Sequence, residues 1–178
     1  MIKKATKAPI PSPVAQQTEC PVARAQSIVG DRWTVLVLRE LTMGNHRFEE
    51  IQAQTAATPQ MLATRLKKLE ADRLVERRPY STRPLRHEYF LTEAGLAFYP
   101  VLLALRSWGE TWLKSEKDER AIHYIHIPCG HDPGLGPVCQ NCGGEMRQDQ
   151  LRPKLSAAFA KERETKRASF KAARAQNA

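Results

Sequence analysis

No stretch of about 18 apolar residues occurs in the 178-residue sequence, so we expect no transmembrane helix. The basic start, Met1 to Lys7, is followed by Pro9, Pro11 and Pro13 instead of an apolar stretch, so we expect no secretory signal. A glycine-rich phosphate loop and a convincing nucleophile–base pair are also lacking, so we expect no enzymatic activity. Cysteine is scarce, and four cysteines without a secretory signal point to metal or redox chemistry rather than to a disulfide framework.

Negative charge is in the minority: 19 Asp and Glu residues stand against 28 Lys and Arg, a net charge of +9. Much of the excess lies at the end of the chain, where residues 147–178 hold nine basic and three acidic residues. A second excess, of eight basic against three acidic residues, lies between Arg65 and Arg86. This second excess is more informative about a polyanionic partner, because it falls in the best-patterned part of the chain.

Composition divides the chain into four parts. Residues 1–19 contain three prolines and few large apolar groups, which predicts a disordered arm. Residues 20–115 carry strong apolar periodicity and form the main domain. Residues 116–150 hold three of the four cysteines and three of the five histidines, which predicts a small appendage. Residues 151–178 are rich in Ala, Lys and Arg and predict a basic tail, either helical or disordered.

The main domain has the pattern of a winged helix. Pro21 and Asp31 mark the starts of two helices, the second apolar on nearly all sides and therefore central to the core. Thr58 and Pro59 predict the cap and first turn of a helix whose leucines at 62, 66 and 69 form one stripe. Strands over 75–80 and 85–91, joined by a turn, predict a β-hairpin. The fold class is thus mostly α with a small β-hairpin wing.

The face of the helix after Thr58 that lies opposite the leucines carries no acid between Pro59 and Leu69. A helix that enters the major groove must supply donors to base edges without repelling phosphate. Arg65 can pair bidentately with guanine, and Lys68 suits a phosphate. A solvated helix surface has the same pattern, so the face alone leaves both interpretations open. The candidate DNA-binding residues here are Thr58, Gln60, Met61, Thr64, Arg65 and Lys68.

The hairpin after this helix adds two further candidates, Arg83 and Arg86. Arg83 lies near the predicted tip, where a wing reaches an adjacent backbone or minor groove that favours arginine. The alternative is a structural β-ribbon that covers the core.

The sequence resembles the HxlR-type group of bacterial winged-helix regulators, relatives of the MarR type. The matching segments are CPVARA (20–25), VGDRW (29–33), LREL (38–41), RF (47–48), TPQML (58–62), LKKLE (66–70), LVERR (74–78) and EYFLT (88–92), followed by Gly95. The resemblance implies a homodimer that binds a pseudo-palindromic operator and represses or activates nearby genes in the bacterial cytoplasm, at the nucleoid. It also implies that residues 58–72 form the recognition helix. The sequence departs from the family in a shorter loop before Thr58 and in His87, where an apolar residue is more common.

The helix after the hairpin carries an apolar stripe that is wider than a three-helix core can cover. We expect a two-fold partner to cover the remainder, unless all of these side chains serve the chain's own core. The candidate dimer-interface residues are Phe98, Leu102, Leu105, Trp108 and Trp112.

Cys20 lies at a predicted helix N-terminus, where the helix dipole favours the thiolate. The resemblance implies an oxidant-sensing role, because the matching cysteine senses oxidants or electrophiles in several family members. The alternative is a small, buried packing residue near the dimer interface.

Residues 120–146 contain half of a zinc-ribbon pattern, a Cys-x-x-Cys-Gly knuckle. The predicted structural Zn²⁺ ligands are Cys129, His131, Cys139 and Cys142. Because Cys129-x-His131 is a tight spacing, His126 and His123 are alternatives for the fourth ligand. A hairpin that has lost its metal is the remaining alternative.

Two functional classes fit these observations. The first is a DNA-binding transcriptional regulator that acts as a homodimer and responds to a thiol oxidant or to a small-molecule effector of unknown identity. The second is an RNA-binding or protein-interaction module that uses the ribbon and the basic tail, since that tail adds affinity for any polyanion.

Overall fold

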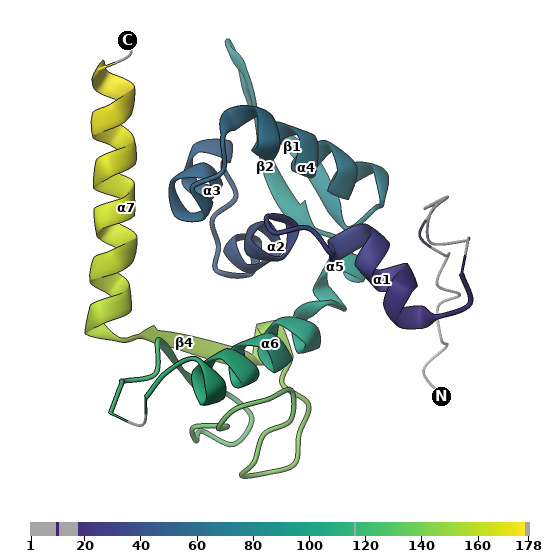
Figure 1. Cartoon of the computed structure of the whole chain (residues 1–178), viewed down its shortest axis with the longest axis vertical. Coiled ribbons are helices and arrows are strands. Elements are labelled where there is room, and N and C mark those ends of the chain that lie inside the picture. Colours follow the sequence, from purple (N-terminus) through teal and green to yellow (C-terminus); the bar gives the residue numbers. More distant parts are fainter. Residues whose placement is uncertain (1–9, 11–17, 116, 177–178) are drawn as a thin grey trace.

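The structure is a computed structural model that describes residue 10, residues 18–115 and residues 117–176. Figure 1 shows a helical unit with a projecting hairpin, a smaller module next to it, and a long C-terminal helix that runs beside the helical unit. The helices are α1 (Pro21–Val29), α2 (Thr34–Thr42), α3 (Phe48–Thr55), α4 (Pro59–Ala71), α5 (Glu93–Leu96), α6 (Tyr99–Trp112), the 3₁₀ turn η2 (Gln148–Gln150) and α7 (Ala157–Gln176). The strands are β1 (Val75–Thr82), β2 (Leu85–Leu91), β3 (Ile122–His126) and β4 (Leu151–Leu155).

The helical unit has α2 at its centre, as the sequence predicts. Val37 and Leu38 of this helix are buried against leucines of α4, and Ile51 of α3 joins the same core. Asp31 accepts hydrogen bonds from the backbone N–H groups of Trp33 and Thr34 at 2.9 and 3.0 Å, so it caps the segment even though the regular helix begins at Thr34.

The helix-turn-helix and the wing form where the sequence predicts them. Thr58 Oγ1 accepts a hydrogen bond from the Met61 N–H at 3.3 Å and caps α4, whose leucine stripe is buried. The strands β1 and β2 pair antiparallel from Val75 and Leu91 to Thr82 and Leu85. This mostly α fold with a β-hairpin confirms the predicted fold class.

The helix predicted after the wing is divided in two. Thr92 caps α5, and its hydroxyl accepts the Gly95 N–H at 3.2 Å, but α5 ends at Leu96. Pro100 is the second residue of α6. Proline has no N–H to donate to the carbonyl four residues earlier and its ring crowds that turn, so a continuous helix is broken here.

The C-terminal module is built on β3 and β4, which pair antiparallel with His126 opposite Leu151 and Ile122 opposite Leu155. It packs on α6, where Tyr99 and Leu103 bury themselves against Met146 and the base of β4. Arg106 of α6 donates to the Ile122 carbonyl at 2.6 Å. The helical unit and the module therefore meet at α6.

The segment 151–178 differs in detail from a simple basic tail. Residues 151–155 form β4 within the module, and residues 157–176 form α7, which packs against α3. The predicted disordered arm, residues 1–19, lies almost wholly outside the described residues. Among the helices described, none is long and apolar enough to cross a membrane.

Candidate DNA-binding surface and metal centre

The exposed face of α4 presents most of the predicted groove-binding side chains. Thr58, Gln60, Met61 and Thr64 are exposed, whereas the leucines on the opposite side are buried. The Thr64 hydroxyl donates to the Gln60 carbonyl at 2.9 Å. Such a surface offers short polar and flexible apolar groups without a carboxylate in the first two turns, which fits approach to a phosphate-lined groove.

The two basic residues predicted on α4 are held by acids. Arg65 Nε lies 3.1 Å from Asp31 Oδ1, and its side chain is 29% exposed. Lys68 Nζ lies 2.6 Å from Asp72 Oδ2. Burial alone would raise the pKa of Asp31, but hydrogen bonds from Thr34 and from backbone N–H groups, together with the charge of Arg65, hold it below its ordinary value. The Arg65 contact uses Nε, so both terminal nitrogens remain outside that ion pair.

The wing, whose strand β1 packs against α4, carries further basic residues. Arg83 and Arg86 are exposed near its tip, whereas Arg77 and Arg78 along β1 form ion pairs with Glu70 and Glu76. The middle of the wing is fixed to the segment before α3 by Arg47, whose Nε lies 3.0 Å from Oε1 of Glu88, the strand partner of Arg78. Arg83 and Arg86 therefore lie at the projecting end of an anchored ribbon (Figure 1).

α6 exposes an apolar stripe. Its exposed fractions are 45% at Val101, 48% at Leu105, 56% at Trp108 and 72% at Trp112. These positions follow one another at spacings of four, three and four, so they lie on one helix face. Of the predicted interface residues, Phe98 and Leu102 instead pack partly into the core. Val101 continues the exposed row in their place.

Cys20 is exposed at the N-cap of α1. Its backbone N–H donates to the Thr18 hydroxyl at 3.1 Å, and its carbonyl accepts the Arg24 N–H at 3.0 Å. The alternative of a buried packing residue does not hold within a single chain.

Three cysteines and one histidine of the C-terminal module converge. The ligand atoms of His126, Cys129, Cys139 and Cys142 all lie within 4.8 Å of one another. His126 Nδ1 is 3.4 Å from the sulfur of Cys129 and 3.3 Å from that of Cys142, and the Cys129 and Cys139 sulfurs are 3.8 Å apart. His126 Nε2 is buried without a hydrogen-bond partner among the described residues, so the ring makes its polar side-chain contacts with sulfur.

Two equivalent turns produce this convergence. In the first, the Gly130 N–H donates to the His126 carbonyl at 2.8 Å, and in the second the Gly143 N–H donates to the Cys139 carbonyl at 2.9 Å. Both glycines have a left-handed backbone, with φ of 74° and 72°. The two turns are thus His-x-x-Cys-Gly and Cys-x-x-Cys-Gly, a pair of knuckles of identical spacing.

His131, the predicted fourth ligand, does not join the cluster, and one of the alternatives, His126, takes its place. His131 follows the turn at Gly130 and pairs with His126 through the backbone, His126 N–H to His131 carbonyl at 2.9 Å. Its ring is exposed, with Nδ1 2.6 Å from the Cys129 carbonyl. His123 also lies elsewhere, with Nδ1 3.6 Å from Asp132. The tight Cys-x-His spacing carries the second residue past the turn and away from the sulfurs.

The thiol of Cys139 is almost fully buried in the cluster. Burial raises the pKa of this thiol, but backbone hydrogen bonds from Cys142 and Asn141 and contacts with the neighbouring thiols lower it below its ordinary value. Backbone N–H groups aimed at sulfur stabilise a thiolate, which is the form that binds metal.

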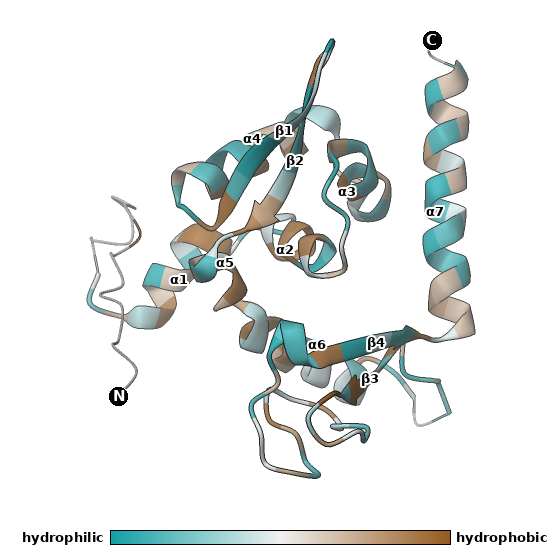
Figure 2. Ribbon diagram, turned by 180° about the vertical axis from the view of Figure 1, so that it is seen from behind, coloured by the Kyte–Doolittle hydropathy of each residue, from teal (hydrophilic) through white to brown (hydrophobic). Residues whose placement is uncertain are grey.

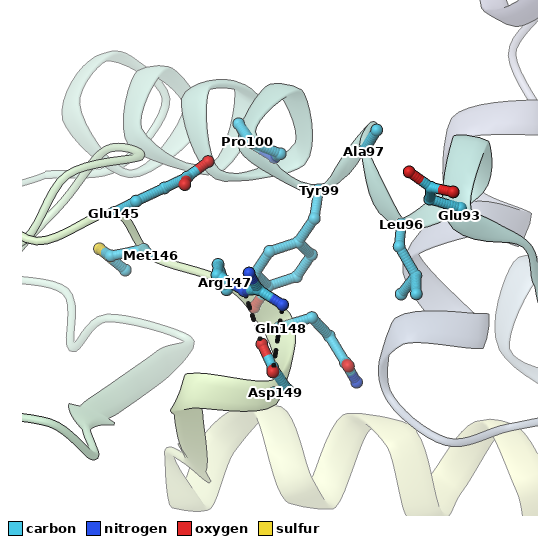
Figure 3. A pocket seen from close by; sticks show the side chains of 10 residues that line it. All are labelled: Glu93, Leu96, Ala97, Tyr99, Pro100, Glu145, Met146, Arg147, Gln148 and Asp149. Atoms are coloured by element: carbon cyan, nitrogen blue, oxygen red, sulfur yellow. Dashed lines mark hydrogen bonds and ion pairs between the residues drawn. The ribbon is translucent and has the colours of Figure 1, made fainter. Parts of the chain in front are cut away.

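A pocket of about 560 Å³ lies beside the contact between the module and the start of α6 (Figure 3). Tyr99 and Leu96 line one side, and residues 145–149 line the other. Arg147 and Asp149 form an ion pair of 3.1 Å within it. The pocket lies between the helices that follow the wing and the segment that connects the second knuckle to β4.

Comparison with known proteins identifies the family. The model of the HxlR-like helix-turn-helix family matches residues 28–117. Rv3095, an HTH-type transcriptional regulator of Mycobacterium tuberculosis, is 36% identical over 140 residues, covering 78% of this chain and 87% of that protein. This chain belongs to the HxlR family of transcriptional regulators. YdeP, an HTH-type regulator of Bacillus subtilis, is 36% identical over 94 residues, covering 52% of this chain and 73% of YdeP.

The HxlR assignment confirms the resemblance inferred from the sequence, and it makes the chain a helix-turn-helix transcriptional regulator rather than an enzyme. Among solved structures, PA1607, described as a transcription factor, has a TM-score of 0.61 at 28% identity, covering 80% of this chain and 97% of PA1607. The family model ends at residue 117, so the PA1607 similarity extends beyond the part that defines the family.

Proposed function

We propose that this HxlR-family regulator binds a pseudo-palindromic operator as a homodimer, with α4 in the major groove and the wing at the adjacent backbone or minor groove. The observation that carries the proposal is the exposed, acid-free first half of α4 beside an arginine-bearing wing. Gln60 and Thr64 supply base-edge contacts, and Met61 supplies an apolar one. A regulator of this kind works at the nucleoid in the cytoplasm, and we propose that location.

Arg65 is proposed as the guanine reader. Its ion pair with Asp31 through Nε supports this role, because a held guanidinium keeps two terminal nitrogens for a bidentate contact. Lys68, Arg83 and Arg86 are proposed phosphate or minor-groove contacts. Thr58 caps the helix that presents them.

We propose that the two subunits join through the α6 stripe. Leu105, Trp108 and Trp112 support this, because each is about half or more exposed in the single chain. Large apolar side chains gathered on one helix face mark an interaction surface. A two-fold axis would then present two copies of α4 to half-sites about 34–36 Å apart.

Selection of bound duplexes from a random DNA pool tests the operator proposal. We expect a palindromic consensus with half-sites one helical turn apart, retained at near-physiological salt. In the same experiment, structured RNA is added as a competitor of the bound DNA. A pool without a consensus, or RNA that displaces DNA with equal affinity, would instead support the RNA-binding or interaction class.

We propose that His126, Cys129, Cys139 and Cys142 hold a structural Zn²⁺ ion. In a tetrahedral site with Zn–S near 2.3 Å and Zn–N near 2.0 Å, sulfurs lie about 3.8 Å apart and nitrogen lies about 3.5 Å from sulfur. One S–S separation of 3.8 Å and two N–S separations of 3.3 and 3.4 Å support this geometry, and the four ligand atoms all lie within 4.8 Å of one another. Four protein ligands leave no open position, so such an ion would hold the two knuckles together rather than perform chemistry.

We propose Cys20 as the oxidant-responsive thiol, since it is exposed at a helix N-terminus. Oxidation by diamide would remove two electrons and two protons from Cys20 and its counterpart in the second subunit, forming an intersubunit disulfide. Non-reducing electrophoresis of the wild type and of Cys20→Ser tests this. A dimer band that persists in the variant would reject Cys20 as the responsive thiol.

A further inference from the structure

The charged side chains in the second half of α7 are all positive. From residue 165 to residue 176 it contains Lys166, Arg167, Lys171 and Arg174 and no acid. Arg167, Lys171 and Arg174 are exposed. Figure 2 shows that the middle of α7 is hydrophilic, unlike the brown core elements of the helical unit.

This basic half lies at the end of α3 that adjoins the wing. The carbonyl of Arg163 accepts a hydrogen bond from Gln54 near the C-terminal end of α3, at 2.9 Å. Arg174 Nη1 lies 3.5 Å from Glu49 Oε1 near the N-terminal end of α3. The two helices therefore run antiparallel. The basic half of α7 accompanies the start of α3.

The start of α3 is also where the wing is attached. Arg47, directly before α3, contacts Glu88 of β2, and its guanidinium lies 4.6 Å from the ring centre of Tyr80 in β1. In Figures 1 and 2, the tip of the wing and the C-terminal end of α7 project from the helix-turn-helix on the same side. Both basic elements thus extend past the helix-turn-helix in one direction.

The position of α7 is fixed by a buried contact. Arg163 forms a bidentate pair with Glu40 of α2, with nitrogen–oxygen distances of 2.9 and 2.6 Å. A helix anchored in this way presents its charges at a defined place, which a free tail cannot do.

Neighbouring acids have partners of their own. Glu49 pairs with Arg174, and Glu50 accepts the backbone N–H of Arg47 at 3.1 Å. Arg167 and Lys171, which line a groove beside these acids, form no ion pair among the described residues. They are the cations of the arm that remain for an anionic partner.

We propose that residues 165–176 of α7 form a second phosphate-binding arm, which contacts the DNA backbone flanking the half-site held by α4 and the wing. This inference rests on the proposed DNA-binding function. Twelve helical residues span about 18 Å, about half of the 34–36 Å of one DNA turn. The arm would therefore extend the contact along the duplex without reading its sequence.

The test compares two full-length double variants with the same reduction in charge. Arg167→Gln/Lys171→Gln removes the proposed contacts, and Lys154→Gln/Lys161→Gln removes two exposed charges from β4 and from the opposite end of α7. Affinity for a selected operator duplex and for a random duplex is measured over a range of salt concentrations. Circular dichroism and light scattering check that both variants keep the fold and oligomeric state of the wild type.

For the arm variant, we expect affinity to fall about tenfold or more on both duplexes, and the log–log salt slope to decrease by about 3 to 4, for two contacts in each of two subunits. The selected consensus should not change. The control variant should stay within about twofold of the wild type. Equal losses of DNA affinity in both variants would show that only the total charge of the protein matters. An unchanged salt slope in the arm variant would show that Arg167 and Lys171 do not contact phosphates. Either result overturns the arm while leaving sequence-selective binding by the wild type intact, whereas absence of that binding overturns the proposed function itself.

Discussion

Glu40 of α2 and Arg163 of α7 form a buried bidentate ion pair between segments separated by 123 residues in sequence. Their side chains are 0% and 6% exposed. Asn45 donates to Glu40 at 2.6 Å, and Arg39 Nη2 lies 2.6 Å from the same carboxylate. The carboxylate is therefore fully partnered, and it connects the core of the helix-turn-helix to the C-terminal helix.

Removing one partner of this pair should destabilise the protein strongly. Arg163→Met leaves a buried carboxylate with fewer donors, which costs about 3–5 kcal/mol, measured as a decrease in the free energy of urea unfolding. The double variant Glu40→Leu/Arg163→Met removes both charges and should cost less than the single variant. The single variant Glu40→Leu completes the comparison. If the destabilisation of the double variant equals the sum of those of the two single variants, the two side chains do not depend on each other.

The same pair should make stability depend on pH in the acidic range. Burial raises the pKa of Glu40, but hydrogen bonds from Arg163 and Asn45 and the charge of Arg39 outweigh it and hold the pKa below its ordinary value of 4.5. A lowered carboxyl pKa stabilises the fold above about pH 4.5, and that contribution disappears as the pH falls through the lowered value. We expect the stability difference between the wild type and Glu40→Gln to be largest at neutral pH and to shrink in acid. A difference that stays constant down to about pH 3 would contradict this assignment.

The helix-turn-helix and the wing can be predicted from the sequence because their signals are local. Thr58, Pro59 and the leucine stripe specify α4 within a dozen residues, and the hairpin follows from alternating strands around one turn. Glu40 gives no such signal, since a glutamate within a helix resembles a solvated residue until its partner in α7 is known. Only the fold brings Arg163 to it, so the docking of α7 cannot be predicted in the same way.

The metal centre is predictable in part for the same reason. Cys139-x-x-Cys142-Gly is a familiar local pattern, whereas His126-x-x-Cys129-Gly has the same spacing with one ligand type changed. Matching the two knuckles by spacing, rather than choosing the histidine nearest in sequence to a cysteine, identifies His126.

The break between α5 and α6 can also be predicted from the sequence, because Pro100 is a local signal for the end of one helix and the start of the next.

The zinc proposal predicts one Zn²⁺ per chain and a difference between two histidines. His126→Ala should release most of the metal and loosen the module, because it removes one of four ligands. His131→Ala, which changes an exposed ring outside the cluster, should keep it. The zinc content of each variant is measured by elemental analysis after gentle purification. Zinc released by a thiol reagent is measured with a colorimetric indicator. Metal-free wild type, or equal metal depletion in the two variants, would reject this ligand set.

The dimer proposal predicts that charge on the α6 stripe yields folded monomers. Leu105→Asp and Trp108→Asp place a carboxylate on side chains that are already exposed in the single chain, so the fold should persist while the interface is disrupted. Ser107→Asp, a partly exposed position of the same helix that is not three or four residues from any stripe residue, is the matched control and should stay dimeric. Light scattering gives the mass. Operator affinity of the monomeric variants should fall about 10²-fold or more, because avidity disappears. Stripe variants that remain dimers would place the interface elsewhere.

The roles assigned to Arg65 and Lys68 of α4 predict that their substitution affects DNA binding in different ways. Arg65→Ala should weaken operator binding by about 1–3 kcal/mol and relax base choice at one position of each half-site. Arg65→Lys keeps the charge but not the planar fork, so it should restore affinity for random DNA without restoring that choice. Lys68→Ala should weaken all duplexes alike and reduce the salt slope by about 1 for each subunit bound. Binding titrations and repeated selection on the three variants separate these outcomes. If Arg65→Ala binds the operator as well as the wild type does, the pair with Asp31 is purely structural and the guanine contact belongs to another residue of α4.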